Sequence, residues 1–556
     1  MALVFVFLYA PIVLLIIFSF NAGNSNTVWQ GFSLEWYEKL FRDRLIMQSV
    51  YTTLLISLLS TIIATVAGTF AAIGFYSMRR RIRDPLMTVN NIPMMNADIV
   101  TGVSLCLFFV AFFNFWGDFA VWFNSLQGVI QLPTRLTMGF GTLLIAHVCF
   151  NIPYVILSVG PKLRQMDKNL VDAAQDLGCT WMQAFWKVII PEIKPGIISG
   201  ALLVFIQSLE DFSNPATIGG DYTTLSIEVY NIITGSYDMR KGSVLALLLL
   251  LPAVIAYLLN KYWVNKKSFV TVTGKPTQAR KLIEEPHIKW PLFAFCLIVS
   301  AIIILFYGTV IFASFVRTWG VDFSLTLDQY RKALQYGWDS LKNSMTLGLI
   351  SAVIGGLLGM VIAYITAKRN YFGKRFIEVS SVLMFAVPGT VLGISYILGF
   401  NSKPLALTGT GIILVIVFTF RNMPVAIESG TTTLLQIDNS IEEASTILGA
   451  DTGYSFRRIT LPMLKNAFFS GIVYSFTKAI TAVSAVIFLV SPRWKLVTSN
   501  IYSLFDMAKY GQAAAFVTMM VGILLVFIGL FNTVINFLLA PRSKVPQAKT
   551  KTEESK

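Results

Sequence analysis

Cysteine and histidine are scarce in this sequence, which has 4 cysteines and 2 histidines among its 556 residues. No two cysteines form a CxxC pair, and three of the four lie in apolar segments. We interpret them as small buried residues, because a disulfide framework or a thiolate metal site requires suitably spaced pairs. His147 and His287 are too few for a histidine-based metal centre, so we expect neither a metal site nor a cofactor. The cysteines are Cys106, Cys149, Cys179 and Cys296.

Charged residues are also few. They make up 13% of the sequence, whereas a soluble protein carries roughly 25%. Hydrophobic residues make up 55%, and the mean hydropathy is +0.67. A soluble protein, even one with a very large core, could not bury so many long apolar runs. The composition therefore predicts a protein whose main surroundings are the lipid bilayer.

Apolar runs of about 20 residues, the length that crosses a bilayer, occur twelve times in two groups of six. The first run has no basic residues before it and no recognisable small-residue cleavage site. We therefore interpret it as a membrane span rather than a signal peptide. The expected spans are 2–20, 50–76, 93–115, 136–159, 196–217 and 242–260, followed by 290–315, 345–367, 378–400, 411–428, 467–490 and 514–540.

Lysine and arginine cluster in alternate loops between these spans. The clusters follow the second, sixth and eighth spans, precede the fifth and the eleventh, and continue in the tail. All of these segments lie on one side of the membrane if both termini are cytoplasmic, as the positive-inside rule predicts. The opposite loops, 21–48 and 316–343, contain tryptophans typical of the membrane interface. The net charge of +15 follows from this clustering and does not indicate nucleic-acid binding.

The two groups of spans repeat the same local patterns. Matches late in each group are displaced by 271 residues and one near the third span by 291, so the first copy holds about 20 extra residues between its third and fourth spans. Copies with the same orientation predict parallel repeats related by an axis along the membrane normal. The matches are Tyr37 with Tyr330, Ser49 with Ser344, Ala97 with Pro388, Asn151 with Asn422, Pro153 with Pro424, Gly178 with Gly449 and Pro191 with Pro462.

These repeats define the expected organisation of the chain. The first half covers residues 1–265 and the second half covers 289–541. The polar stretch 266–288, which contains glycine and proline, is the expected cytoplasmic linker between them. Residues 542–556 are charged and poor in apolar residues, so we expect a disordered cytoplasmic tail.

One motif occurs in both halves, in the basic loop between the fourth and fifth spans. An acidic residue stands six positions before a glycine, and a proline follows the glycine by thirteen. This spacing predicts a helix, a glycine turn, a second helix, and a proline before the next span. The residues are Asp172, Gly178 and Pro191 in the first copy and Glu443, Gly449 and Pro462 in the second.

A rigid helical hairpin of this kind can dock into a groove on a cytoplasmic partner. The alternative is an amphipathic helix that rests on lipid. Two copies in the same register on the basic side favour docking.

These loops resemble the EAA loops of the binding-protein-dependent ABC importer permeases. The likeness covers essentially the whole chain, with the loops at 165–195 and 436–466. Asp172, Val188 and Ile190 depart conservatively from the pattern in the first copy, as Ser445 does in the second. The residues expected to couple to an ATPase are Asp172, Ala173, Ala174, Gly178 and Pro191, and Glu443, Ala444, Ser445, Gly449, Ile459, Leu461 and Pro462.

The resemblance implies an all-α membrane protein with about 12 transmembrane helices, arranged as two parallel six-helix repeats of the MetI-like fold. It also implies two ABC ATPase subunits and an extracytoplasmic substrate-binding protein as partners, in the inner membrane of a bacterial cell. An ion-gradient-driven secondary transporter could also have twelve helices in two repeats. It would have no ATPase to dock, so the paired loops disfavour it.

The substrate implied by the resemblance differs along the chain. Residues 29–37 and 97–105 are similar to spermidine/putrescine permeases, whereas residues 208–216 and 482–489 are similar to fused ferric-ion permeases. The fused arrangement favours iron(III). A polyamine or a phosphonate remains an alternative.

The sequence contains no motif that would make the chain an enzyme. It has no G-x-x-x-x-G-K-[ST] phosphate-binding loop, so ATP hydrolysis is expected on another subunit. It has no Gly-x-Ser-x-Gly or HExxH motif and no paired catalytic carboxylates in a loop.

Polar residues inside the expected spans are candidates for the substrate path, because intramembrane charges are costly and usually face the bundle interior. The alternative is a structural role, such as a pair between Arg421 and Glu428, which are seven residues apart on one helix face. An acidic path would be lopsided, since the second half has no acids equivalent to Glu210 and Asp211. The candidates are Asp98, Asn151, Glu210, Asp211, Arg421 and Asn422.

Overall fold

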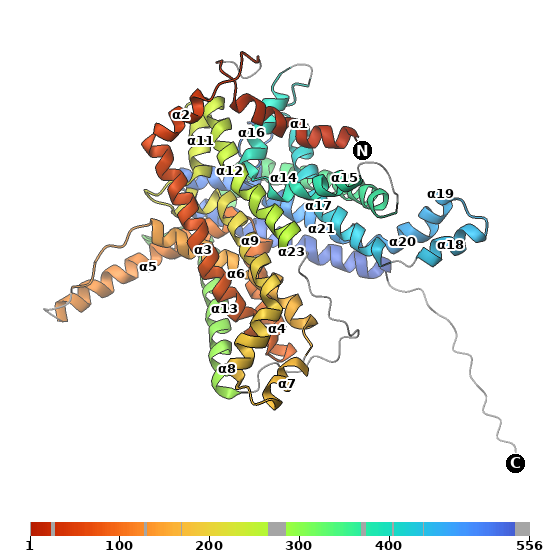
Figure 1. The fold of residues 1–556 in the computed structure, drawn as a ribbon. Helices are drawn as coiled ribbons and strands as arrows, with labels where there is room; N and C mark the ends of the chain where they lie inside the picture. The colour runs from red at the N-terminus through yellow and green to blue at the C-terminus, as the bar shows by residue number, and fades with distance from the viewer. Residues whose placement is uncertain are drawn as a thin grey trace.

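The computed structural model describes residues 2–23, 28–126, 131–167, 169–264, 285–368, 374–402, 405–436 and 439–539. Over these ranges the chain is predominantly helical (Figure 1), as predicted. One two-stranded antiparallel sheet pairs β1 (Val316–Thr318) with β2 (Asp322–Leu325). Most of the predicted linker and the whole predicted tail lie outside the described residues.

Nine helices in the described ranges are long and apolar enough to cross a membrane. Helices suit this role because they satisfy their own backbone hydrogen bonds in lipid. Two continue through a π-helical turn: α8 (Trp181–Ala184) into α9 (Ile190–Glu210), and α12 (Met239–Leu259) into residues 260–264. The other seven are α3 (Arg44–Tyr76), α5 (Asp98–Leu126), α6 (Phe140–Gln165), α13 (Pro286–Ser314), α14 (Asp328–Lys368), α17 (Gly411–Leu435) and α23 (Tyr510–Leu539).

The remaining three expected spans correspond to shorter helices. These are α1 (Ala2–Ser19), α16 (Gly389–Phe400) and α21 (Lys465–Thr481). Pro388 separates α16 from the preceding α15 (Lys374–Leu383) and its 3₁₀ extension, because proline cannot donate the hydrogen bond that would continue the helix. The number of twelve spans therefore stays a prediction.

Further short helices connect these elements. They are α2 (Glu35–Arg42), α4 (Arg80–Met95), α7 (Asn169–Asp176), α10 (Ser213–Ile218), α11 (Leu225–Gly235), α18 (Asn439–Ile447), α19 (Thr452–Ser455), α20 (Leu461–Met463) and α22 (Val497–Asp506).

Hydrogen bonds repeat between the halves. The Tyr37 hydroxyl lies 2.8 Å from the Ser19 hydroxyl, and the Tyr330 hydroxyl lies 2.7 Å from the Ser314 hydroxyl. Each bond ties the next helix of a half, α2 or α14, back to the last residue of its first helix, α1 or α13. The match of Tyr37 with Tyr330 is therefore confirmed by equivalent bonds.

A second pair of equivalent bonds corrects another match. The Leu225 amide donates to Thr53 Oγ1 at 2.7 Å, and the Val497 amide donates to Ser344 Oγ at 2.9 Å. Both bonds fix the first residue of a short helix, α11 or α22, against a long one. Ser344 is thus equivalent to Thr53, displaced by 291 residues, and the match with Ser49 was wrong by one helical turn.

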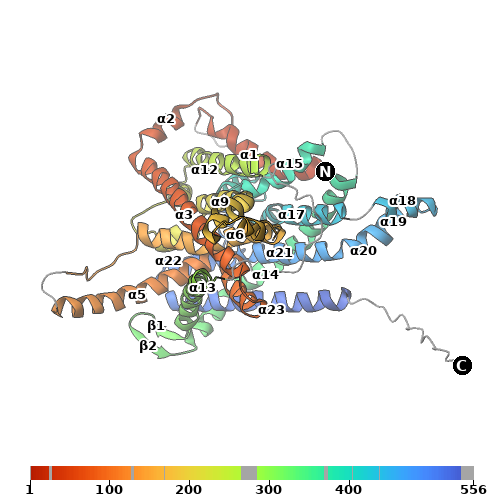
Figure 2. The ribbon, with the colours of Figure 1, turned by 60° about the horizontal axis from the view of Figure 1, so that its bottom comes forward.

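The two halves exchange helices. α1 packs on α16 of the second half, and α13 packs on α5 of the first half. At the first contact the Tyr396 hydroxyl donates to the Phe7 carbonyl oxygen at 3.2 Å, and at the second the Thr101 and Tyr307 hydroxyls lie 2.9 Å apart. The hydrophobic core is consequently continuous across the halves, as the interleaved helices of Figure 2 illustrate.

Candidate functional site

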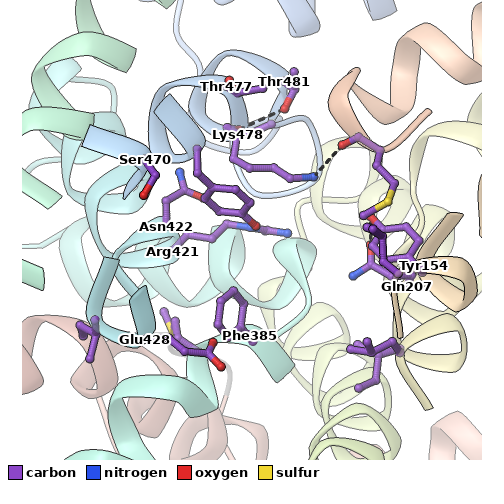
Figure 3. Close-up of a pocket in the computed structure, with 18 of the residues that line it drawn as sticks. Tyr154, Gln207, Phe385, Arg421, Asn422, Glu428, Ser470, Thr477, Lys478 and Thr481 are labelled. Carbon is purple, nitrogen blue, oxygen red and sulfur yellow. Dashed lines mark hydrogen bonds between the residues drawn. The ribbon is translucent and has the colours of Figure 1, made fainter. Parts of the chain in front are cut away.

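A cavity of about 1240 Å³ lies between the two halves. The first half contributes side chains from α4, α5, α6, α9 and α12, and the second half contributes side chains from α14, α15, α17, α21 and α23. Figure 3 shows Arg421 and Lys478 extending from the second half toward Tyr154 and Gln207 of the first. The cavity thus lies where two parallel repeats would form a path between them.

A chain of polar contacts crosses the boundary between the halves. The Tyr154 hydroxyl donates to Gln207 Oε1 at 3.2 Å, and Gln207 Nε2 donates to Glu210 Oε1 at 2.9 Å. The other oxygen of Glu210 accepts from Arg421 Nη2 at 3.5 Å. Tyr154 and Gln207 were not among the predicted site residues, because a neutral polar residue in an apolar run gives no distinctive signal.

Arg421 is held against a glycine. A Cβ atom at Gly389 would overlap the Arg421 guanidinium group and the Ser484 hydroxyl, so only glycine leaves room for the arginine there. The sequence suggested a pair between Arg421 and Glu428 as a structural alternative. In the structure Arg421 pairs with Glu210 instead. Glu428 nevertheless lines the same cavity.

Lys478 and Asp98 form a second cross-half arrangement. Lys478 Nζ donates to the Met94 carbonyl oxygen at 3.5 Å, and Asp98 lies within electrostatic range of Lys478. Both side chains line the cavity. In these two arrangements the first half provides the acids, Asp98 and Glu210, and the second half provides the bases. The division is not complete, because Glu378 and Glu428 of the second half and Lys261 of the first half also line the cavity.

The six predicted path residues divide into two groups. Asp98, Glu210, Arg421 and Asn422 line the cavity, whereas Asn151 and Asp211 are not among its lining residues. Asn151 Nδ2 donates to Ser208 Oγ at 2.9 Å and ties α6 to α9. Asp211 Oδ2 lies 3.2 Å from His147 Nε2 and accepts from Asn214 Nδ2 at 2.8 Å. These bonds give both residues a structural role beside the cavity.

Four aromatic side chains meet across the boundary between the halves, and none of them is among the residues that line the cavity. The rings of Phe212 and Tyr230 from the first half meet those of Phe488 and Tyr502 from the second, with centroids 5.3 to 6.0 Å apart. Tyr230 and Tyr502 occupy equivalent positions on α11 and α22 and meet edge to face at 88°. We call these four residues the aromatic plug.

The described residues of the first EAA-like loop, 165–195, fold as the spacing of the motif predicts. α7 ends in a turn at Gly178, whose φ of +88° is a backbone conformation that glycine adopts without strain. The Cys179 amide donates to the Ala174 carbonyl oxygen at 3.0 Å, which closes the turn as in a Schellman motif. Thr180 then caps α8 by accepting from the Gln183 amide, and Pro191 lies at the start of α9.

The second EAA-like loop, 436–466, has an equivalent turn. Gly449 has a φ of +84°, and the Ala450 amide donates to the Ser445 carbonyl oxygen at 3.1 Å. The Ser445 hydroxyl, which replaces an alanine of the motif, lies 2.6 Å from the Ser455 hydroxyl and joins α18 to α19. Ala444 and Ser445 lie on α18, Ile459 lies in the π-turn, and Leu461 and Pro462 form part of α20.

The tips of both loops expose a leucine that the motif did not identify. Leu177 and Leu448, each directly before the turn glycine, are both 86% exposed. They are equivalent in the repeat. An apolar side chain held outward by a rigid turn at the same position in both halves is suited to insertion into a groove of a partner.

Comparisons with known proteins were consistent with this duplicated architecture. The family model described as "binding-protein-dependent transport system inner membrane component" matches residues 64–268 and again residues 355–545. The chain is 33% identical over 425 residues to the ferric transport system permease protein of Actinobacillus pleuropneumoniae. That alignment covers 74% of this chain and 61% of the relative, so the chain spans less than two thirds of that relative's length.

Two further similarities cover about half of the chain. The chain is 32% identical over 256 residues to the putrescine transport system permease protein of Escherichia coli, covering 46% of this chain and 85% of that protein. A solved bacterial ABC transporter involved in the import of the acidic polysaccharide alginate aligns with a TM-score of 0.40 and 16% identity, over 45% of this chain and 96% of that one.

Proposed function

Because the chain belongs to the family of binding-protein-dependent transport system inner membrane components, we propose that it is the permease of an ATP-driven importer with both permease halves in one polypeptide. The observation that supports this most strongly is the pair of equivalent hairpins, each with a glycine turn and an exposed leucine. An importer driven by two ATPase subunits needs two such docking points.

The proposed mechanism moves a small solute through the cavity between the halves. The cavity extends from Glu210 and Arg421 toward Lys261 and Asn466. These two residues lie near the basic loops that the positive-inside rule predicts to be cytoplasmic. The aromatic plug stands at its other end. This arrangement supports an inward-facing state, from which ATP binding to the docked subunits would close the cavity and separate the plug.

Iron(III) is the proposed substrate, because the ferric permease is 33% identical over 74% of the chain. A polyamine remains the alternative, supported by the putrescine permease, and a phosphonate is a further one. A thermal-shift screen of the transporter's own binding protein against iron(III), putrescine, spermidine and phosphonates should identify the solute. Uptake of that solute by vesicles containing the complete transporter then tests the function directly.

A secondary transporter driven by an ion gradient is the competing function. It predicts uptake that an ionophore abolishes and that does not require ATP inside the vesicle. The proposed importer predicts the reverse, namely uptake that requires internal ATP and the binding protein and persists when the gradient is collapsed.

One permease chain is expected to bind two ATPase subunits. Reversal of charge at Asp172 or at Glu443, to lysine, should weaken one docking point each, and the effects need not be equal because the loops differ in sequence. Native mass spectrometry of the assembled transporter measures the stoichiometry. Two permease chains with two ATPase subunits would contradict the fused arrangement.

The pair formed by Glu210 and Arg421 provides a prediction about the cavity. Glu210→Arg or Arg421→Glu alone should reduce uptake at least tenfold, because each leaves two like charges facing each other inside the membrane. The double exchange should recover a substantial part of the loss, because it restores an opposite pair. Equal defects in the single and double variants would instead indicate that each side chain contacts the solute separately.

The orientation of the chain is tested by labelling single cysteines with a membrane-impermeant maleimide. Cysteines placed at Leu177 and Leu448 should react only from the cytoplasmic side, and a cysteine at Leu126 only from the outside, because the basic loops lie with the hairpins. Labels at Lys275 and Ser25 extend the test to cytoplasmic and external positions outside the described residues. External labelling at residue 275 would overturn the predicted topology.

A further inference from the structure

Asp211 joins three helices of the first half beside the aromatic plug. It lies between α9 and α10, directly before Phe212. Its Oδ1 atom accepts from the Ser213 amide at 3.0 Å and from the Asn214 amide at 3.3 Å, which are the first two amides of α10. Its Oδ2 atom accepts from Asn214 Nδ2 at 2.8 Å and lies 3.2 Å from His147 Nε2 of α6. We call His147, Asp211 and Asn214 the polar latch.

The latch is buried, so its charge has no access to water as an alternative partner. The side chains of His147 and Asp211 are 1% and 2% exposed. A carboxylate removed from water is stable only where donors surround it, and the loss of one donor is costly. Asp211, and the backbone that carries it, are therefore held at one position relative to α6.

Asp211 also positions both first-half members of the plug. The Ser226 hydroxyl, on α11, donates to the Asp211 carbonyl oxygen at 2.6 Å. Tyr230 lies one helical turn further along α11. Phe212 follows Asp211 directly, and its ring meets those of Tyr230 and Tyr502 at centroid distances of 5.3 and 5.7 Å. The two rings that the first half presents to the second half are thus fixed through one residue.

The second half repeats the backbone bond but not the latch. The Thr498 hydroxyl donates to the Ala482 carbonyl oxygen at 2.7 Å, which is the equivalent of the bond between Ser226 and Asp211. The positions displaced by 271 residues from the latch hold apolar side chains. These are Phe418 for His147, Ala482 for Asp211 and Ala485 for Asn214.

The segments that follow also differ between the halves. Residues 213–218 form α10, whereas the equivalent residues 484–489 form successive turns. Both segments pack closely on the helix behind them. A Cβ atom at Gly102 would lie 3.1 Å from a carbonyl oxygen of α10, and one at Gly393 would lie 2.7 Å from the Ala485 carbonyl oxygen. Close packing is therefore common to both halves, and the polar latch distinguishes the first.

We propose that His147 and Asp211 are positioning residues that hold Phe212 and Tyr230 against the second half and thereby stabilise the closed plug in the resting transporter. This inference rests on the importer function proposed above, in which ATP binding separates the plug. A change that destabilises one of two states shifts the population toward the other. Weakening the latch should therefore favour the state with the plug open and the ATPase subunits engaged.

The test exchanges the latch for the residues that the chain itself has at the equivalent positions. The triple variant His147→Phe, Asp211→Ala and Asn214→Ala gives the first half the apolar set of the second half, which the same fold accommodates. ATP hydrolysis is measured on the complete transporter in vesicles without its binding protein. We expect hydrolysis per complex to rise roughly fivefold, the lower end of typical couplings between two states. With binding protein present, the uptake obtained per ATP hydrolysed should fall.

Two further variants complete the experiment. His147→Phe alone leaves Asp211 with its donors in α10, so we expect a smaller rise in hydrolysis than in the triple variant. Thr142→Val is the matched control, because Thr142 Oγ1 donates to the Ile218 carbonyl oxygen at 3.1 Å, at the other end of α10. It removes a bond from the same segment without touching the latch. Its hydrolysis and uptake should stay close to those of the native chain.

A purely structural role of the latch predicts a different result. It would lower the amount of assembled transporter and leave the ratio of uptake to hydrolysis unchanged, and this result in both latch variants would overturn the proposal. An equal rise of hydrolysis in Thr142→Val would also overturn it. If native uptake requires ATP and the binding protein but neither latch variant raises hydrolysis, the inference fails and the proposed function stands. Native uptake that needs no ATP would remove both.

Discussion

A covalent bridge between positions 230 and 502, now Tyr230 and Tyr502, is expected to reduce uptake at least tenfold. The two rings belong to opposite halves and lie 6.0 Å apart between centroids, at equivalent positions of the repeat. If the plug closes the external end of the path, the halves must part there for solute to enter. Cysteines at both positions, bridged by a short cleavable thiol reagent, would hold the plug shut. Uptake should return when the bridge is reduced.

The controls are the two single-cysteine variants treated in the same way, which cannot be bridged. Cys149 and Cys179 should be replaced by serine beforehand, because both native cysteines are partly exposed. Because the four rings are in contact in the proposed inward-facing state, the bridge is also expected to trap the transporter with its cavity open toward the cytoplasm. Full uptake by a chain shown to be bridged would exclude the plug from the path.

Replacing either turn glycine by valine is expected to reduce uptake at least tenfold without preventing insertion in the membrane. Gly178 and Gly449 have φ values of +88° and +84°. A side chain other than glycine costs roughly 1–2 kcal/mol in that conformation, and a β-branched one is a rare outlier there. The turn would relax into another shape and displace the exposed leucine beside it, which the proposed docking to an ATPase subunit needs in place.

Asparagine at the same positions is the matched control. It tolerates a positive φ better than other residues, so Gly178→Asn and Gly449→Asn should retain most of the uptake. A Cβ atom at either glycine would meet no other atom within 4 Å. A difference in uptake between the valine and asparagine variants would therefore come from backbone strain and not from a steric clash. The amount of ATPase that copurifies with the membrane chain separates lost docking from lost expression.

The two helical hairpins were predictable because the spacing that specifies them is local in the sequence. The fixed spacing of Gly178 and Pro191, repeated at Gly449 and Pro462, specified a helical hairpin, and the structure has a turn at each glycine. What the pattern could not provide was the exposed pair Leu177 and Leu448, because exposure depends on how the hairpin leaves the bundle.

The cavity was predictable only in part because its contacts are long-range. Charges in apolar runs identified Asp98, Glu210 and Arg421, since such charges usually face the bundle interior. Their partners could not be deduced: Arg421 pairs with Glu210, 211 residues earlier, and not with Glu428 on its own helix. The aromatic plug could not be predicted from the sequence. Its four residues resemble the many other aromatic residues of the apolar segments, and only the fold brings them into contact.

The exchange of helices between the halves determines the order in which helices can pack during synthesis of the chain. α1 leaves the ribosome about 370 residues before α16, the surface on which it finally packs. At synthesis rates of roughly 5–20 residues per second, it waits on the order of 20–70 s in the bilayer without that partner. α13, by contrast, emerges when α5 is already in place. Until α16 is made, α1 can pack only on α12 of its own half, whereas α13 finds α3 and α5 already synthesised.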